Sequence, residues 1–450
     1  MSELNKNTHK VGIFIMWFSL FLVLIAGISL LYVYKSDAVD FIGYYIAGLV
    51  LSIGIYAAVT YRIKQNKPMH ILIKTFSMFW ILIIMGSSFV GMGFAYIQNV
   101  RENFSAAPFL NWTDEQDPTS AITISWITSK PTNTILQYGL NSSNLNESIT
   151  FAEKTRFHHV AIKNLTADTT YYYQVSPYTI KQFTTAPSTE ENFTFFFWTD
   201  HRTNSGYDTS IKKNNQPNVV EYIAAYAKSE GITPAFSICS GDITATSNDY
   251  QTWKIWYDDI ASNDWASNHT IQMAFGNHER HSDASGTHLK AYYPYNVKPD
   301  GHFYHSFDYG AAHFIMLDPY NSGADWGPNF TVDQLTWLEN DLATHQAAKF
   351  TVISMHPPPI YYYGLKTEIA RLSELYSIDL ILCGHYHDYD VKTFNGTTQI
   401  IAGIGGNPNN EFNAFECDTG FLRVDINSTQ MKVQSRFING TVLDNLNFNA

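Results

Sequence analysis

The hydrophobic positions divide the chain into stretches with different patterns, and the first stretch ends near residue 100. Before that point they form three long runs without a charged residue. Each run is long enough to cross a hydrocarbon core of about 30 Å as a helix. Three such runs in succession are difficult to bury in a soluble protein, and the first is too long for a signal peptide. We therefore expect a transmembrane region over residues 1–100, with spans at about 11–34, 41–61 and 75–97.

The charged residues beside these runs predict an orientation. Lys6 and Lys10 precede the first run, whereas the first loop combines Lys35 with Asp37 and Asp40. Four basic residues surround the second loop: Arg62, Lys64, Lys67 and Lys74. Because loops rich in lysine and arginine stay in the cytoplasm, we expect a cytoplasmic N-terminus and an extracytoplasmic chain after residue 100.

The N-x-S/T glycosylation sequons agree with this orientation, since all of them lie beyond residue 100. They begin at Asn103, Asn111, Asn141, Asn146, Asn164, Asn192, Asn268, Asn329, Asn395, Asn427 and Asn439. Such sites are glycosylated only in exported segments. The pattern therefore predicts a multi-pass membrane protein, with the lipid bilayer as a partner and an exported, glycosylated domain.

The segment from about residue 107 to 185 shows the alternation of short strands. In AITISWITS, the residues Ile122, Ile124 and Trp126 fall on one face, and Thr123 and Ser125 fall on the other. TTYYYQV and KQFTT continue the same pattern without an intervening helical period. We expect a β-sandwich over residues 105–187. The adjacent pair of histidines at 158 and 159 is interpreted as structural or interfacial.

After the polar linker PSTEEN, apolar strands alternate with helical patterns. The predicted strands are FTFFFW, PAFSIC, TIQMAF, HFIML, FTVISM and LILC, and the predicted helices are VVEYIAAYAKSEG, VDQLTWLENDLATH and TEIARLSELY. Gly231 is expected to cap the first of these helices. This alternation predicts a layered α/β domain over residues 192–450.

Composition adds two limits. The net charge of -12 argues against a protein that binds nucleic acid non-specifically, so a phosphate-bearing substrate has to be attracted locally. Only three cysteines occur, and Cys239 and Cys383 both lie in apolar strands, where we interpret them as small buried hydrophobes.

Polar side chains follow most of the predicted strands of the α/β domain. In chain order they are Asp200, His201 and Arg202; Gly241 and Asp242; Gly276, Asn277, His278 and Glu279; His356; and His385 and His387. Ligand sites in open α/β sheets lie outside the carboxyl ends of the strands, so these groups can meet at one edge. Imidazole and carboxylate together are typical ligands of transition metals, and a carboxylate such as Asp242 can bridge two of them.

Each motif alone has a plainer interpretation. A Gly-Asp pair after a strand is usually a turn, and a lone H-x-H can be a hydrogen-bonded loop. Their occurrence in one order, each behind its own strand, favours a shared metal site.

The motifs GD, GNHE, HPP and GHYH resemble those of the calcineurin-like metallophosphoesterase superfamily, and the whole exported part resembles the purple acid phosphatases. The resemblance implies a fibronectin type III-like β-sandwich followed by an αββα metallophosphoesterase domain. It also implies that one metal is held by Asp200, Asp242 and His387, and the other by Asp242, Asn277, His356 and His385. His278 is implied to contact the phosphate or to protonate the leaving oxygen.

Two positions depart from that family pattern. Ala245 stands where the purple enzymes have a tyrosine ligand, and Arg202 stands where many relatives have a histidine. Either His201 reaches the first metal through a bent backbone, or that metal has only three protein ligands. Arg202 is suited to a forked grip on phosphate oxygens, with a structural ion pair as the alternative.

The predicted function is hydrolysis of phosphomonoesters by a water activated between two divalent ions, with Mn, Fe or Zn as the metals. Two alternatives stay open: hydrolysis of phosphodiesters or nucleotides at the same site, and a weakly catalytic sensor that binds phosphate outside the membrane. The three consecutive tyrosines at 361–363 are expected at the rim of the site or over the core.

Overall fold

The computed structural model describes residues 104–450 except 114–115, 202–217, 281–282, 284–285, 321–326 and 406–418. The predicted membrane spans lie outside these residues. Within the described part of the chain, no helix is both long enough and apolar enough to cross a membrane. The transmembrane region therefore stays a prediction.

The N-terminal part of the described chain is all β. Its strands are β1 (Ala106–Asn111), β2 (Ile122–Gly139), β3 (Glu147–Ile162), β4 (Thr170–Gln174) and β5 (Lys181–Thr184). The long strand β2 pairs antiparallel with β1, β3 and β4. Apolar and polar residues alternate along the start of β2, but neither face is exposed to solvent: Thr123 and Ser125 are as buried as Ile124 and Trp126.

The polar face of β2 is buried because it packs against the α/β domain. The Ser125 hydroxyl lies against the Tyr295 hydroxyl, which is 2.5 Å from Nδ1 of His159. Burial lowers the pKa of His159 to about 4, so this ring is neutral at physiological pH. His158 instead stacks on Trp126. Both histidines are thus structural or interfacial, as expected.

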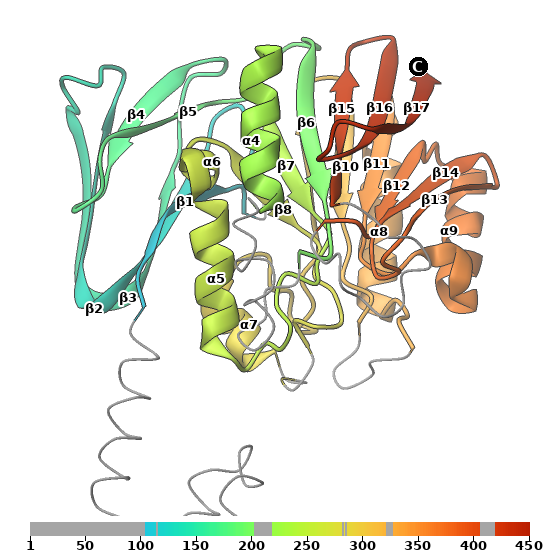
Figure 1. The fold of residues 1–450 in the computed structure, drawn as a ribbon, viewed down its shortest axis with the longest axis horizontal. Helices are drawn as coiled ribbons and strands as arrows, with labels where there is room; N and C mark the ends of the chain where they lie inside the picture. The colour runs from blue at the N-terminus through green and yellow to red at the C-terminus, as the bar shows by residue number, and fades with distance from the viewer. Residues whose placement is uncertain are drawn as a thin grey trace, which may run out of the picture. The chain divides into compact units, whose positions relative to one another are not determined.

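The α/β domain is built on two sheets (Figure 1). The first contains β6 (Phe193–Trp198), β7 (Phe236–Cys239), β8 (Thr270–Met273), β15 (Gly420–Ile426), β16 (Gln430–Phe437) and β17 (Val442–Asn449). Strands β6, β7 and β8 are parallel. One parallel pairing, Leu110 with Thr270, joins β1 to β8, so this sheet continues into the all-β part.

The second sheet contains β9 (His305–Tyr309), β10 (Ala312–Met316), β11 (Phe350–Ser354), β12 (Leu380–Cys383), β13 (Tyr389–Phe394) and β14 (Thr397–Ala402). Strands β10, β11, β12 and β14 are parallel, and β9 and β13 are antiparallel edge strands.

The longer helices cover the outer faces of the two sheets: α4 (Val219–Glu230) and α5 (Tyr250–Ile260) lie on the first, and α8 (Val332–Thr344) and α9 (Tyr363–Leu375) on the second (Figure 1). Two short helices are α6 (Trp265–Asn268) and α7 (Thr287–Tyr292). Helix α4 ends as predicted at Gly231, whose φ of 66° is the left-handed conformation that glycine adopts without strain.

The continuous apolar strands are explained by burial on both faces. In β6, Phe195 and Phe197 belong to the core between the two sheets, whereas Phe196 and Trp198 pack with α4 and α5. A third core joins the second sheet to α8 and α9. This arrangement confirms the predicted α/β sandwich, and it brings the carboxyl ends of the parallel strands in both sheets to one edge.

Candidate metal centre

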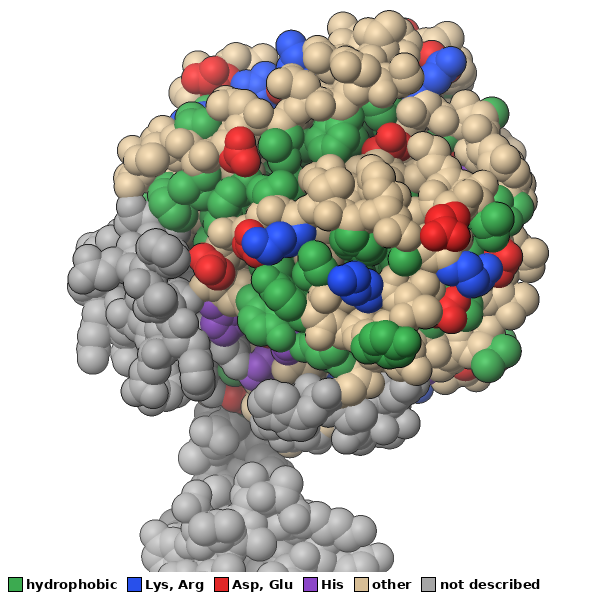
Figure 2. Space-filling view, turned by 90° about the vertical axis from the view of Figure 1, so that its right-hand side faces the viewer, with side chains coloured by type: hydrophobic (Ala, Val, Ile, Leu, Met, Phe, Trp, Pro, Cys, Tyr) green, Lys and Arg blue, Asp and Glu red, His purple; other side chains and the backbone are tan. Residues whose placement is uncertain are grey.

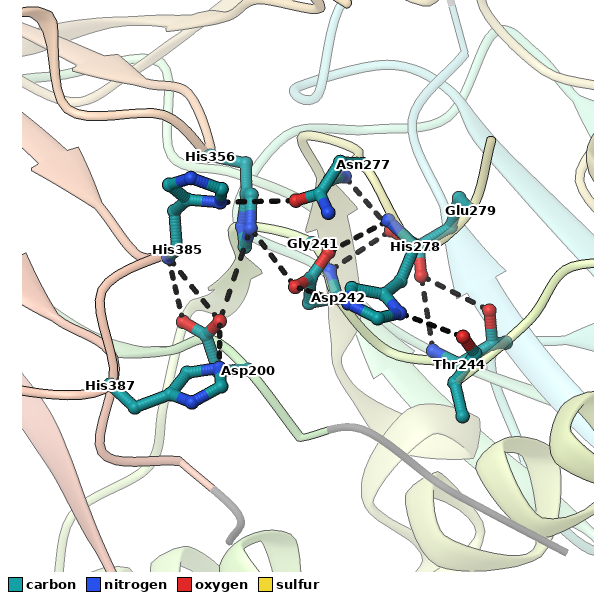
Figure 3. A network of polar contacts seen from close by, with 12 residues as sticks. Asp200, Gly241, Asp242, Thr244, Asn277, His278, Glu279, His356, His385 and His387 are labelled. Atoms are coloured by element: carbon teal, nitrogen blue, oxygen red, sulfur yellow. Dashed lines mark hydrogen bonds and ion pairs between the residues drawn. The ribbon is translucent and has the colours of Figure 1, made fainter. Parts of the chain in front are cut away.

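The six predicted metal ligands lie together at this edge (Figure 3). They follow five different strands: Asp200 after β6, Asp242 after β7, Asn277 after β8, His356 after β11, and His385 and His387 after β12. Residues almost 190 positions apart in the sequence are therefore neighbours in space.

Asp200 is buried between the loops that follow β6 and β12. Its Oδ1 is 3.4 Å from Nε2 of His387 and 3.9 Å from Nε2 of His356. The backbone N–H of His385 donates to Oδ2 at 3.1 Å. The backbone of one histidine thus orients Asp200, while Oδ1 of Asp200 faces the side chains of two other histidines.

Asp242 occupies the middle of the cluster. Its Oδ2 is 3.2 Å from Nε2 of His356, and its Oδ1 accepts from the backbone N–H of His278 at 3.0 Å. Since His356 donates Nδ1–H to the carbonyl of Ser240 at 2.6 Å, Nε2 is the nitrogen that could bind an ion. This position suits a carboxylate that bridges two ions.

Asn277 and His385 form the remaining side of the cluster. The Oδ1 atom of Asn277 is 3.0 Å from Nδ1 of His385. Burial, together with the nearby charge of His356, lowers the pKa of His385 to about 4. His385 is therefore neutral at physiological pH, which is the form that binds metals.

The backbone is held in unusual conformations at this centre. Asp200, Asp242 and His385 have φ values of 58°, 51° and 72°, a region that non-glycine residues occupy at a cost. Two glycines allow the close approach: a Cβ at Gly276 would overlap Asp242, and one at Gly384 would overlap Asp200. Tight packing around the carboxylates thus explains the glycines of GNHE and GHYH.

Glu279 fixes the loops that carry Asp242 and Asn277. Its buried carboxylate accepts from the backbone N–H groups of Asp242, Ile243, Thr244 and Gly276 at 2.8 to 3.0 Å. Sequence reasoning singled out GNHE without giving this glutamate a task. In the structure, this carboxylate accepts hydrogen bonds from backbone N–H groups that have left the strands and would otherwise be buried without an acceptor.

The three predicted catalytic residues have different surroundings. His278 donates Nδ1–H to the carbonyl of Ala245 at 2.7 Å, and its Nε2 is 3.8 Å from Asp242. His201 has its Nε2 2.8 Å from Asp259 of α5. This nitrogen of His201 is thus engaged by a carboxylate of a helix rather than by the cluster. Arg202 lies outside the described residues.

The donor set fits metal ions. The ligand atoms of Asp200, Asp242 and His356 all lie within 4.8 Å of one another. Nε2 of His356 is buried and points between the two carboxylates, 3.2 Å from Oδ2 of Asp242 and 3.9 Å from Oδ1 of Asp200, without a well-oriented hydrogen bond to either. A buried imidazole nitrogen that faces two carboxylates in this way is expected where a cation binds.

The electrostatics of the cluster also favour a bound cation. Burial lowers the pKa of His356, but the carboxylates of Asp242 and Asp200 outweigh burial and raise this pKa to about 9. Burial likewise raises the pKa of Asp200, while His356 and His387 hold it below its ordinary value. The two buried carboxylates therefore require positive charge between them, which is what metal ions provide.

The centre is reached from solvent. The side chains of His278 and His387 are 17% and 13% exposed. Figure 2 shows histidine side chains exposed at the surface of the molecule.

Two parts of the chain match known protein families. Residues 108–196 match the purple acid phosphatase N-terminal domain, and residues 208–389 match the calcineurin-like phosphoesterase family. These matches confirm the resemblance found from the motifs.

The proteins similar to this chain include several purple acid phosphatases. Purple acid phosphatase 23 of Arabidopsis thaliana is 27% identical over 56% of this chain and 62% of its own length. Purple acid phosphatase 15 of the same plant is 26% identical over 56% of this chain and 53% of its own. The chain thus spans between half and two thirds of the length of these curated relatives. The structure of purple acid phosphatase PPD1 from yellow lupin seeds covers 77% of this chain and 74% of its own, with a TM-score of 0.59 at 16% identity, which indicates a shared fold.

Proposed function

We propose that this protein is a dinuclear-metal phosphatase that hydrolyses phosphomonoesters. The observation that carries the proposal is the convergence of six ligand side chains from five strands, with Asp242 between the two halves of the set. The matches to phosphoesterase families support the same reaction class.

The ligand residues divide into two groups. Asp200, His387 and Asp242 would hold one ion, and Asp242, Asn277, His356 and His385 would hold the other. Nitrogen and oxygen ligands without a thiolate suit Mn²⁺, Fe²⁺ or Zn²⁺. Two such ions lower the pKa of a shared water and draw phosphate oxygens to an otherwise acidic chain.

His278 is the proposed proton donor to the leaving oxygen. Because its Nδ1–H is donated to the Ala245 carbonyl, the ring is held with Nε2 toward Asp242, and the side chain is partly exposed to solvent. A protonated Nε2 can then transfer its proton to the departing alkoxide. Arg202, only two residues beyond Asp200 in the sequence, would grip phosphate oxygens with its forked guanidinium.

The proposal extends to location. The three uncharged runs before residue 100 would anchor the enzyme in a membrane, and the basic flanks would place residues 104–450 on the extracytoplasmic side.

The experiment uses the full chain purified in detergent and p-nitrophenyl phosphate as substrate. Asn277→Ala and His385→Ala should each abolish phosphate release, because each removes a ligand of the second ion. A chelator should abolish wild-type activity, and added Mn²⁺ should restore it. Asn445→Ala on the exposed face of β17 is the matched control and should behave as wild type. Unchanged turnover in Asn277→Ala would contradict the proposal. If wild type hydrolyses bis(p-nitrophenyl) phosphate faster than p-nitrophenyl phosphate, the enzyme is a phosphodiesterase instead.

A further inference from the structure

The surroundings of His385 suggest a residue that determines how this ligand binds its ion. We infer that Tyr362 is a positioning residue: its hydroxyl holds the proton of His385 on Nε2 and so presents Nδ1 to the metal. This inference rests on the proposed dinuclear function, because it concerns the second ion of that centre.

The two nitrogens of His385 face opposite surroundings. Nδ1 is 3.0 Å from Oδ1 of Asn277, and Nε2 is 2.7 Å from the hydroxyl of Tyr362. Two donors bound to one ion at about 2.1 Å, with an angle of about 90–110° between the bonds, are separated by roughly 3.0–3.4 Å. Without an ion, this pair forms an Nδ1–H to Oδ1 hydrogen bond when the proton is on Nδ1. The same distance also matches two ligands of one ion, and Nε2 points away from that position.

The tautomer of the imidazole decides whether this geometry can bind a metal. A neutral imidazole carries one proton, and only the nitrogen without it can bind an ion. When the Tyr362 oxygen accepts from Nε2–H, the lone pair is left on Nδ1, on the side of Asn277. Such partners orient histidine ligands and increase their affinity for metals.

The backbone explains why Tyr362 rather than its neighbours reaches His385. A 3₁₀ turn, η3 (Pro359–Tyr361), precedes it, and Tyr362 is the N-cap residue of α9. Tyr361 is 49% exposed, and its hydroxyl donates to Asp390 at 3.1 Å. Tyr363 is 88% exposed. Three consecutive tyrosines thus have three environments, and only the middle one contacts the candidate ligand.

Tyr320 is a second phenol beside the same ring. Its hydroxyl is 3.4 Å from Nδ1 of His385, on the side of Asn277. It therefore lies on the metal-facing side and cannot hold the proton on Nε2. The assignment to Tyr362 follows from which nitrogen each hydroxyl faces.

The test compares Tyr362→Phe with Tyr361→Phe, since each removes one hydroxyl and keeps the ring. Mn²⁺ is titrated by calorimetry into the chelator-treated full chain in detergent, and the coupled or uncoupled state of bound Mn²⁺ is followed by electron paramagnetic resonance. Tyr362→Phe should bind one of the two ions about 10- to 100-fold more weakly. At Mn²⁺ concentrations that fill both sites of wild type, it should show the signal of isolated ions. Tyr361→Phe should bind both ions as wild type does.

The outcomes separate this inference from the proposed function. Equal affinity of both sites in Tyr362→Phe and wild type would overturn the role of Tyr362. Equal weakening in both variants would also overturn it, because the effect would then belong to the loop. The unfolding temperature of chelator-treated Tyr362→Phe should match that of wild type, which shows that any loss arises at the ion. If wild type binds two Mn²⁺ ions with this dependence on Tyr362 but hydrolyses no phosphate ester, the proposed function fails and the inference stands.

Discussion

Replacing Glu279 with glutamine tests how the loops of the centre are held. Each carboxylate oxygen of Glu279 accepts from two backbone N–H groups: Oε1 from Ile243 and Thr244, and Oε2 from Asp242 and Gly276. Glutamine keeps one oxygen and turns the other into an NH₂ group. Two buried N–H groups then lose their acceptor and face a second donor.

The expected magnitude follows from that count. Leaving a buried donor unsatisfied costs about 1–3 kcal/mol, so two of them cost about 2–6 kcal/mol. The mutation also removes a repulsion, because burial and the neighbouring charge of Asp242 raise the pKa of Glu279. This relief offsets part of the loss. We expect a net decrease of about 3 kcal/mol in the free energy of unfolding.

Urea unfolding followed by tryptophan fluorescence measures this loss in the presence of a chelator, which removes the contribution of bound ions. Glu153→Gln on the exposed part of β3 is the matched control and should change stability by less than about 0.5 kcal/mol. With saturating Mn²⁺ the difference should widen, because displaced Asp242 binds the ions less tightly. A Glu279→Gln variant as stable as Glu153→Gln would refute the proposed role of Glu279 in holding the two loops.

Two further predictions concern pH and location. Burial lowers the pKa of His313, but hydrogen bonds to Asp308 at 2.7 Å and Asp341 at 2.8 Å outweigh it and raise the pKa to about 9, above the value of about 6.5 in an unfolded chain. The stabilisation that protonated His313 gives the folded protein is therefore complete below about pH 6.5 and is lost as the pH rises through 9. The difference in unfolding free energy between wild type and His313→Gln should thus shrink by about 3 kcal/mol from about pH 6 to about pH 10. A difference that does not change with pH would exclude the ion pairs of His313 with Asp308 and Asp341. The full chain should also stay in the membrane pellet after an alkaline carbonate wash, and external protease should digest residues 104–450 on intact cells; release by carbonate would contradict the three predicted spans.

The strands of the α/β domain could be predicted because their apolar runs are short and bounded by polar residues. FTFFFW forms β6 over Phe193–Trp198, and LILC forms β12 over Leu380–Cys383. Both faces of these strands are buried, so the run is continuous and its ends are sharp. The same sharp ends expose the polar residues that follow. The meeting of the candidate ligands was therefore foreseeable from strand order alone.

Helix α5 (Tyr250–Ile260) is absent from the predicted helices, although the sequence carries a signal for it. Trp253, Trp256, Tyr257 and Ile260 are buried at helical spacing, and the Asp249 side chain caps the first turn. Tryptophan and tyrosine have little intrinsic preference for helices, which makes so short a pattern ambiguous. The helix is stabilised by packing against the first sheet, and this contact is visible only in the fold.

Contacts between distant segments set the limit of sequence reasoning at the site itself. YYYG gives no indication of which tyrosine turns inward, because that depends on η3 and on where His385 lies. Likewise, the sequence offered His201 as a ligand beside Asp200, whereas the fold places Asp259 of α5 at its Nε2. A residue type indicates the chemistry that is possible, but the partner is decided by packing.

Without bound ions, the buried carboxylates of the centre destabilise the folded protein. This destabilisation explains why so many surrounding residues form hydrogen bonds and ion pairs with the centre. Asp200, Asp242 and Glu279 are each at most 2% exposed, and three buried carboxylates in neighbouring loops repel one another. Two of the loops also carry aspartates in the left-handed conformation. Backbone donors to Glu279 and the charge on His356 offset part of this repulsion. Cations bound between Asp200 and Asp242 would offset the rest, so metal binding and the stability of these loops should rise together.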